Sequence, residues 1–295
     1  MPHHRLSRIS KAGRKSLFRT VAALAVLFVA ACGNIPGPSS TPSQRAGLES
    51  KYIDIGAPLN IRLHYLRAGD PAGRRVIFVH GTPGSAYAFT DYLVNVPPGF
   101  EFISIDRPGF GKSGPEGAVV SLERQALALR PLLVTRGGKK PILVGHSLGG
   151  PIIARAAVDN PGKIGGLVIA AGSLDPDLEE VQLVQHVAEV FGLSYLVSRK
   201  LRNANRELIG LKKHLVLLQP RLKDIRCPVV IVHGTKDDLV PYKNVAFMRR
   251  HLTGSARITV VRLDGTNHFL PWNSKAALDR SVALLDSGEM PRCAA

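Results

Sequence analysis

Residues 143–150 read LVGHSLGG and place Ser147 between two glycines, with an apolar run before it and an Ile- and Ala-rich run after it. An apolar run followed by a helical pattern is typical of a strand that turns into a helix. On such a bend a serine side chain is displayed at the end of a sheet, where it can act as a nucleophile. A G-x-S-x-G motif also occurs by chance around a small turn residue, so the interpretation of Ser147 depends on its partners.

A serine hydroxyl is a weak nucleophile until an imidazole takes its proton, and the imidazole works best when a carboxylate fixes its tautomer. For a serine on a strand-to-helix bend, the chain order is Ser, then acid, then His. Asp237 follows the apolar run 229–232, and His268 follows the run 258–261. Functional groups in open α/β sheets gather past strand ends. The sequence therefore predicts that Ser147, Asp237 and His268 form a catalytic triad.

From residue 50 onward, short Val-, Ile- and Leu-rich runs alternate with longer amphipathic runs, which is typical of parallel strands covered by helices. Several short runs are apolar throughout, which indicates that both faces of the sheet are covered. The predicted strands are 61–66, 75–79, 102–105, 142–144, 166–170, 229–232 and 258–261. The predicted helices are 119–134, 148–159, 245–251 and 274–285, the first of which Pro131 should end early.

Between residues 173 and 225 this alternation stops, and a helical pattern follows Asp175-Pro176, which predicts an N-cap with proline at the first helical position. We interpret 173–225 as a helical cap. Residues 175–189 hold five acids and no base, whereas 198–223 hold eight Lys or Arg and a single acid, Glu207. The basic half either forms a solvated helix face or lies against an anionic surface or substrate.

Taken together, these motifs resemble the α/β-hydrolase fold family over about residues 50–287. The resembling segments are the nucleophile elbow GHSLG at 145–149, HGTPG at 80–84, DRPGFGKS at 106–113, and the acid and histidine in their order. The resemblance implies an α/β fold with a mostly parallel, doubly covered sheet and a helical cap inserted after the sixth strand. The core would comprise 50–172 and 226–295, and the cap 173–225.

The resemblance also implies an oxyanion hole, a pair of N–H groups that stabilises the charge developing on the carbonyl oxygen. HGTPG resembles the family's loop that lends one of these donors. Pro83 has no N–H, so Thr82 is the expected donor, together with the N–H of Leu148 after the nucleophile.

Two other aspartates compete with Asp237 for the role of the acid. Asp238 would take it if the loop register shifts by one residue, and Asp175 follows the preceding strand, where some relatives of this fold place the acid. The family-like spacing G-x-x-D-x-x-V-P begins at Gly234 and favours Asp237. For Asp175, a role as the N-cap of the following helix is a better explanation than a role as the catalytic acid.

Several polar residues near the predicted strand ends receive structural interpretations. His80 and His233 each precede a glycine, and we interpret them as loop histidines. His146 should point away from its neighbour Ser147 and pack in the interior. Asp106 and Arg107 are interpreted as structural residues of their loop.

The resemblance implies a serine hydrolase that acts on carboxylic esters or related acyl compounds without a cofactor. Serine rather than aspartate at position 147 disfavours the dehalogenase and epoxide hydrolase branches. An acyltransferase or a cofactor-free perhydrolase would use the same triad, as would carbon–carbon bond hydrolases and peptidases. A catalytically silent envelope lipoprotein is a further alternative. GFGKSG at 109–114 matches G-x-G-x-x-G, but no dinucleotide-binding unit surrounds it.

Residues 1–31 carry six Lys or Arg, no acid, and an apolar stretch that is too short to span a bilayer, which needs about 20 residues. This pattern predicts a secretory signal peptide. The sequence VAAC at 29–32 resembles the lipobox of bacterial lipoproteins, which implies lipidation of Cys32; cleavage after Ala31 without lipidation and a retained anchor are the alternatives. Residues 32–49 read as a flexible, lipid-anchored linker. The expected location is the bacterial cell envelope, with the protein membrane-anchored and facing outside the cytoplasm.

Removal of the six basic residues in 1–31 lowers the formal charge from +17 to +11. No basic stripe interleaved with aromatics is present, so nucleic acid is not an expected partner. The expected partners are a small acyl substrate and the membrane. Three cysteines exclude a Cys-based metal site, although Cys227 and Cys293 could pair in an oxidising compartment.

Overall fold

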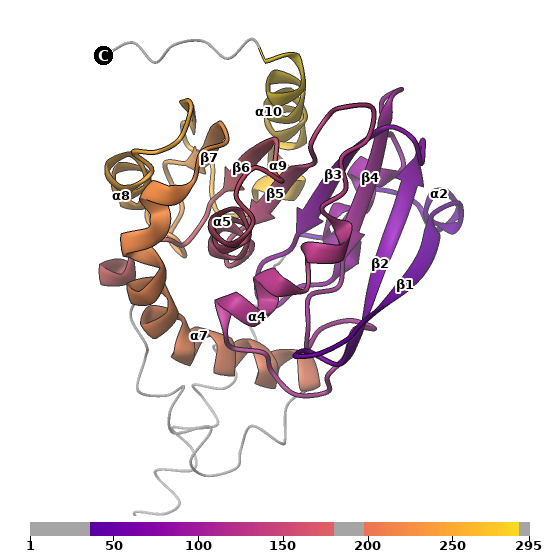
Figure 1. Ribbon diagram of the computed structural model, residues 1–295, viewed down its shortest axis with the longest axis horizontal. Helices are drawn as coiled ribbons and strands as arrows, with labels where there is room; N and C mark the ends of the chain where they lie inside the picture. Colours follow the sequence, from indigo (N-terminus) through magenta and orange to yellow (C-terminus); the bar gives the residue numbers. More distant parts are fainter. Residues whose placement is uncertain (1–35, 180–197, 289–295) are drawn as a thin grey trace, which may run out of the picture.

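The computed structural model of the chain describes residues 36–179 and 198–288. Eight strands form one sheet in the order β1-β2-β4-β3-β5-β6-β7-β8 (Figure 1). The strands are β1 (Glu49–Ile55), β2 (Ile61–Gly69), β3 (Arg74–Val79), β4 (Phe100–Ile105), β5 (Ile142–His146), β6 (Gly166–Ala170), β7 (Val229–Gly234) and β8 (Ile258–Leu263). The pairs β1–β2 and β2–β4 are antiparallel, and the remaining pairs are parallel. The predicted fold class is confirmed.

Each of the seven strands predicted from sequence is present, but β1 had no sequence prediction. Its side chains are mostly exposed, and its first half, Glu49-Ser50-Lys51, is polar throughout. It pairs with β2 from Glu49↔Arg67 to Ile55↔Ile61 at the sheet edge. Because strand prediction relies on burial patterns, an edge strand of this composition gives a weak signal.

Helices connect the strands along the chain and cover the sheet (Figure 1). The helices are α2 (Pro42–Ala46), α3 (Thr90–Leu93), α4 (Leu122–Leu127), α5 (Gly149–Asp159), α7 (Arg199–Leu218), α8 (Lys243–His251), α9 (Leu270–Asn273) and α10 (Lys275–Ser287). The 3₁₀ turns are η1 (Ala86–Phe89), η2 (Arg130–Leu132), η3 (Pro176–Leu178) and η5 (Gln219–Asp224). Pro131 lies in η2, so the predicted helix 119–134 ends early as expected.

Strand residues alternate between two apolar clusters, one on each face of the sheet. In β3, Ile77 belongs to the cluster that α5, α7 and α8 cover, whereas Phe78 belongs to the cluster that α3 and α10 cover. This alternation follows from the two-residue period of a strand. Both faces are therefore buried, as the continuous apolar runs predicted.

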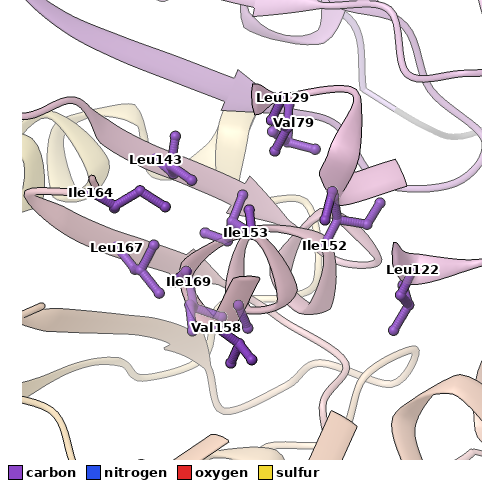
Figure 2. Close-up of a cluster of buried hydrophobic side chains, with 14 of the residues drawn as sticks. Val79, Leu122, Leu129, Leu143, Ile152, Ile153, Val158, Ile164, Leu167 and Ile169 are labelled. Atoms are coloured by element: carbon purple, nitrogen blue, oxygen red, sulfur yellow. The ribbon is translucent and has the colours of Figure 1, made fainter. Parts of the chain in front are cut away.

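Helix α5 packs on the centre of the sheet directly after the nucleophile elbow. Figure 2 shows its residues Ile152, Ile153 and Val158 together with labelled residues of the sheet, among them Leu143 of β5 and Ile169 of β6. All five side chains are almost fully buried. Truncation of such a side chain to alanine typically costs about 2–5 kcal/mol of stability. The position of α5, and with it the elbow, is therefore well determined by packing.

The segment after β6 contains the helices that the sequence assigned to a cap. Asp175 accepts a hydrogen bond from the Asp177 N–H at 3.0 Å and caps η3, which confirms its predicted capping role. Most of the first predicted cap helix falls in 180–197, outside the described residues. Helix α7 then begins after its N-cap Ser198, whose hydroxyl accepts from the Leu201 N–H.

Two serines within the predicted linker 32–49 contact α3. Ser39 and Ser40 both donate backbone hydrogen bonds to the Asp91 carboxylate at 2.8 Å, and Thr41 caps α2. Polar groups rather than apolar ones therefore hold Ser39 and Ser40 against Asp91, and α2 buries none of its residues.

The predicted signal peptide 1–31, Cys32 and Cys293 lie outside the described residues. No helix within 36–179 and 198–288 has both the length and the hydropathy that a membrane span requires.

Close packing of the elbow on its neighbours leads to a stability prediction. A Cβ on Gly149 would lie 2.2 Å from the Val79 carbonyl oxygen, so Gly149→Ala forces α5 away from β3. We expect it to lower the free energy of unfolding by at least about 2 kcal/mol, as overpacking against a rigid backbone does. Gly56→Ala is the control, because nothing lies within 4 Å of its added Cβ. Urea unfolding measures both, and a wild-type midpoint for Gly149→Ala contradicts the packing.

Candidate active site

Ser147 lies on the bend between β5 and α5 in a strained backbone conformation. Its φ is +54°, in the left-handed region that non-glycine residues rarely adopt. The Ser147 N–H donates to the Ala170 carbonyl at 3.0 Å, and its own carbonyl accepts from the Gly150 N–H at 2.9 Å. A single residue held in this region costs about 1–3 kcal/mol and persists only when its surroundings enforce it. Such strain is found at functional sites, which agrees with the display of Ser147 as a nucleophile.

The neighbouring glycines explain how the bend is enforced. A Cβ on Gly145 would lie 2.4 Å from the Gly149 carbonyl oxygen, so the strand end and the helix start touch backbone to backbone. A Cβ on Gly81 would lie 2.7 Å from the Ser147 Cβ, so the HGTPG loop passes directly against the serine. Glycine is required where backbones approach this closely.

Asp237 and His268 meet at the carboxyl ends of β7 and β8. His268 Nδ1 donates to Asp237 Oδ2 at 2.8 Å, and both residues are about 6% exposed. The other carboxylate oxygen, Oδ1, accepts from the N–H groups of Leu239 and Val240. These contacts orient the carboxylate and leave Nε2 of His268 as the ring nitrogen that is free to exchange a proton.

The Asp237 carboxylate is stabilised in its ionised form. Burial alone would raise its pKa, but the side chains of His233 and His268 and the Val240 N–H outweigh this effect. The result is a pKa below the ordinary value of 3.8. His233, which the sequence assigned to a structural role, places Nε2 3.5 Å from Asp237 Oδ2 and also donates to the Val240 carbonyl. Asp237 is therefore a carboxylate at neutral pH.

His146 connects the Asp237–His268 pair to the nucleophile elbow. Its Nε2–H donates to the His268 carbonyl at 2.9 Å, and the centroids of the two rings lie 4.8 Å apart. The His268 loop is thereby held at the end of β5, one residue from Ser147. Within residues 36–179 and 198–288, no hydrogen bond joins Ser147 Oγ to His268 Nε2. Such bonds are commonly long without substrate and shorten when it binds.

One predicted oxyanion donor, Leu148, follows Ser147 in the chain, and the other, Thr82, belongs to the loop that passes against the serine. Leu148 is the N-cap of α5, where helix N–H groups lack intrahelical partners. Thr82 follows Gly81, which lies against the serine. In the part of the chain that the structure describes, neither N–H donates a hydrogen bond, and the Thr82 hydroxyl is also buried without a partner. Both N–H groups therefore remain available to an added oxygen atom.

The other aspartates near the strand ends have hydrogen-bond partners or solvent around them rather than His268. Asp238 is exposed to solvent, and Asp175 caps η3. Asp106 accepts hydrogen bonds from His64 Nδ1 and from two backbone N–H groups. Its neighbour Arg107 contacts different partners and is fully buried. None of these carboxylates contacts His268.

Sequence reasoning missed a buried ion pair between Arg107 and Glu207, whose atoms approach to 2.7 Å. Glu207 is an isolated acid among basic residues of the predicted cap, and this isolation is the signal that could have revealed it. Within the described ranges, no group of three or more His, Cys, Asp or Glu side chains could hold a metal ion.

Burial of His146 leads to a prediction about pH. Burial lowers its pKa from 6.5 to about 3, and the neighbouring His268 adds to this effect. Between these values the unfolded chain binds one more proton than the folded protein, so stability falls as the pH falls from 6.5. We expect His146→Gln, which keeps an N–H donor, to reduce this slope by about 1.4 kcal/mol per pH unit. Urea unfolding at pH 7, 6 and 5 measures it, and an unchanged slope contradicts the assignment of a neutral His146.

Two bacterial hydrolases have sequences similar to that of this chain. A 2-hydroxy-6-oxononadienedioate/2-hydroxy-6-oxononatrienedioate hydrolase of Dechloromonas aromatica (strain RCB) is 25% identical over 65% of this chain and 80% of its own length. A 2-hydroxy-6-oxo-6-phenylhexa-2,4-dienoate hydrolase of Comamonas testosteroni is 26% identical over 79% of this chain and 95% of its own.

Among solved structures, the 2-hydroxy-6-oxo-6-phenylhexa-2,4-dienoate hydrolase of Rhodococcus sp. strain RHA1 has a similar fold. It superposes with a TM-score of 0.63 at 17% identity, over 81% of this chain and 99% of its own. The family model that describes the alpha/beta hydrolase family matches residues 76–279, which include the elbow, Asp237 and His268. The chain therefore belongs to the alpha/beta hydrolase family.

Proposed function

We propose that the protein is a serine hydrolase that cleaves carboxylic esters or related acyl compounds through an acyl-enzyme on Ser147. The observation that carries this proposal is the buried hydrogen bond between Asp237 and His268. His146 holds the His268 loop next to Ser147, whose backbone has a strained, positive φ. Nucleophile, base and orienting acid are the three groups that acyl transfer requires.

In the proposed reaction, His268 Nε2 takes the proton of Ser147 Oγ as the oxygen attacks the substrate carbonyl carbon. The carbonyl oxygen becomes an oxyanion and accepts hydrogen bonds from the Thr82 and Leu148 N–H groups. The protonated imidazole then gives its proton to the departing alcohol, and the acyl group remains on Ser147. Water repeats the sequence with His268 as base, which releases the acid and restores the serine.

Asp237 has two roles in this proposal. Its hydrogen bond keeps the proton on Nδ1 of His268, so that Nε2 presents its lone pair to the serine. Because the carboxylate is ionised at neutral pH, it also stabilises the imidazolium that forms in the buried site.

Carbon–carbon bond hydrolysis is the second candidate, and the names of the two curated relatives favour it. Both are named as hydrolases of unsaturated 2-hydroxy-6-oxo acids. These names contain a ketone but no ester or amide, so hydrolysis of such a substrate would break a carbon–carbon bond. The same triad would serve, so product analysis with a p-nitrophenyl ester and with such a dienoate separates the candidates. Alcohol or peroxide as acceptor tests acyl transfer and perhydrolysis in the same way.

Substitution of the nucleophile tests the proposal directly. We expect Ser147→Ala to lower kcat on p-nitrophenyl esters by at least about 10³-fold and to abolish labelling by a fluorophosphonate probe. Ser43→Ala, which changes an exposed serine of α2, should label like wild type. Labelling that persists in Ser147→Ala would overturn the assignment. An unlabelled wild-type protein would favour the catalytically silent envelope lipoprotein.

We also propose that Cys32 carries the lipid that attaches the protein to the bacterial envelope. This proposal rests on the sequence of residues 1–32 alone. After growth with an alkyne analogue of palmitate, the wild-type protein should carry the label and sediment with membranes. Cys32→Ser should carry no label and leave the membrane fraction. Equal labelling of both proteins contradicts the proposal.

A further inference from the structure

The peptide unit between Gly81 and Thr82 joins the proposed oxyanion donor to a buried hydrogen-bond network. A trans peptide is planar, so the Gly81 carbonyl and the Thr82 N–H point in opposite directions from one rigid unit. The Gly81 carbonyl accepts from His80 Nδ1 at 2.7 Å and from Arg107 Nη2 at 3.1 Å. Contacts that fix the carbonyl therefore also fix the direction of the N–H.

Arg107 is suited to hold this peptide because its guanidinium is rigid and fully buried. Nη1 and Nη2 donate to the two carboxylate oxygens of Glu207 at 2.7 and 2.9 Å, in a bidentate pair. The guanidinium also lies over the Phe110 ring, with its carbon 4.7 Å from the ring centroid. A planar fork with paired donors loses little freedom when it binds, which makes its position well defined.

Glu207 brings the cap helix into contact with this network. It lies on α7, is 2% exposed, and also accepts from Gln125 Nε2 at 2.8 Å. Arg107 follows β4 in the core, one hundred residues earlier in the chain. The ion pair therefore joins α7 to the loop that carries the proposed oxyanion donor.

His80 completes the anchor on the core side. Its Nε2 accepts from the Arg107 N–H at 3.1 Å, which leaves the proton on Nδ1, the nitrogen that donates to the Gly81 carbonyl. Burial and the charge of Arg107 lower the pKa of His80 to about 3. The ring is therefore neutral at pH 7, in the tautomer that the Gly81 contact requires.

We propose that Arg107 and Glu207 are positioning residues for the oxyanion hole. Glu207 on α7 holds the Arg107 guanidinium against the Gly81 carbonyl, and this orients the Thr82 N–H toward the oxyanion. The inference rests on the proposed function of Ser147 and extends it, because docking of the cap helix would then control how strongly the transition state is stabilised.

Stability and positioning can be separated with a double variant. Breaking one partner of a buried ion pair leaves an unpaired charge, whereas removing both charges often leaves stability unchanged. Arg107→Met/Glu207→Gln removes both charges and keeps an oxygen acceptor for Gln125. We expect it to unfold at a urea concentration close to that of wild type, well above Glu207→Gln alone.

The same double variant should nevertheless hydrolyse esters slowly. We expect kcat to fall about 10- to 100-fold with little change in KM, since loss of a complete donor costs about 10²- to 10³-fold. The affinity for an arylboronic acid, whose tetrahedral adduct on Ser147 presents an oxygen to the hole, should fall by a similar factor. A residue with only a structural role would not weaken this adduct while stability is retained.

The matched control is Arg74→Met/Asp286→Asn. Arg74 is a buried arginine at the start of β3, at the opposite end of the sheet from Ser147, and it pairs with Asp286 of α10 at 2.9 Å. Like Arg107, it also donates to backbone carbonyls, those of Lys140 and Leu285. This variant should keep the wild-type kcat and boronate affinity.

Amide hydrogen exchange of residues 80–86 tests the anchor without requiring catalysis. It should be faster in Arg107→Met/Glu207→Gln and unchanged in the control. The inference would be overturned if the double variant had the same kcat, the same boronate affinity or the same exchange rates as wild type.

If the wild-type protein fails to react with fluorophosphonate, the proposed function fails. Hydrogen exchange alone then decides whether Arg107 and Glu207 anchor the peptide. If the double variant does not fold, Arg107→Lys replaces it, because lysine keeps the positive charge but lacks the paired guanidinium donors. We expect the same changes in kcat, boronate affinity and exchange for this variant.

Discussion

The close approach of α5 to the sheet is the constraint on which the site depends. Backbone atoms of β5, β3 and the start of α5 lie so near one another that only glycine fits at positions 145 and 149. Ser147 and Leu148 separate β5 from α5, and of these two residues Ser147 adopts the positive φ at the bend. Burial of α5 against the sheet stabilises the fold enough to hold this strain (Figure 2). Packing in the core therefore determines the exposure of the serine.

Around this bend, the buried charged side chains are held by hydrogen bonds from other buried groups. Asp237 accepts from His268 and two backbone N–H groups, and His146 holds the His268 loop. On the other side, Arg107 and Glu207 neutralise each other beside the HGTPG loop. In a low-dielectric interior each of these interactions is stronger than in water. These contacts fix the orientation of the side chains around Ser147, which the proposed catalysis requires.

The fold was largely predictable because its signals are local: the apolar runs of β3, β5, β6 and β7 and the periodicity of α5 follow directly from burial on the sheet. Asp237 and His268 were predicted to be close from chain order, and the structure brings Nδ1 of His268 within 2.8 Å of Asp237 Oδ2.

Edge strand β1 was missed, since most of its side chains face solvent. The pairing of Arg107 with Glu207 was not predicted. Glu207 stood out as the single acid in 198–223, but neither spacing nor composition identified Arg107, one hundred residues earlier, as its partner. The contacts of Ser39 and Ser40 with Asp91 were not predicted either, because polar groups make them.

The central claim is that Ser147 Oγ becomes acylated during turnover. Mixing the protein with p-nitrophenyl acetate, quenching it in acid within the first turnovers and mapping its peptides by mass spectrometry measures this directly. The proposed chemistry requires one acetyl group on the peptide that contains Ser147. Steady hydrolysis of the ester with no acetyl on that peptide, or with the acetyl on another residue, would contradict it.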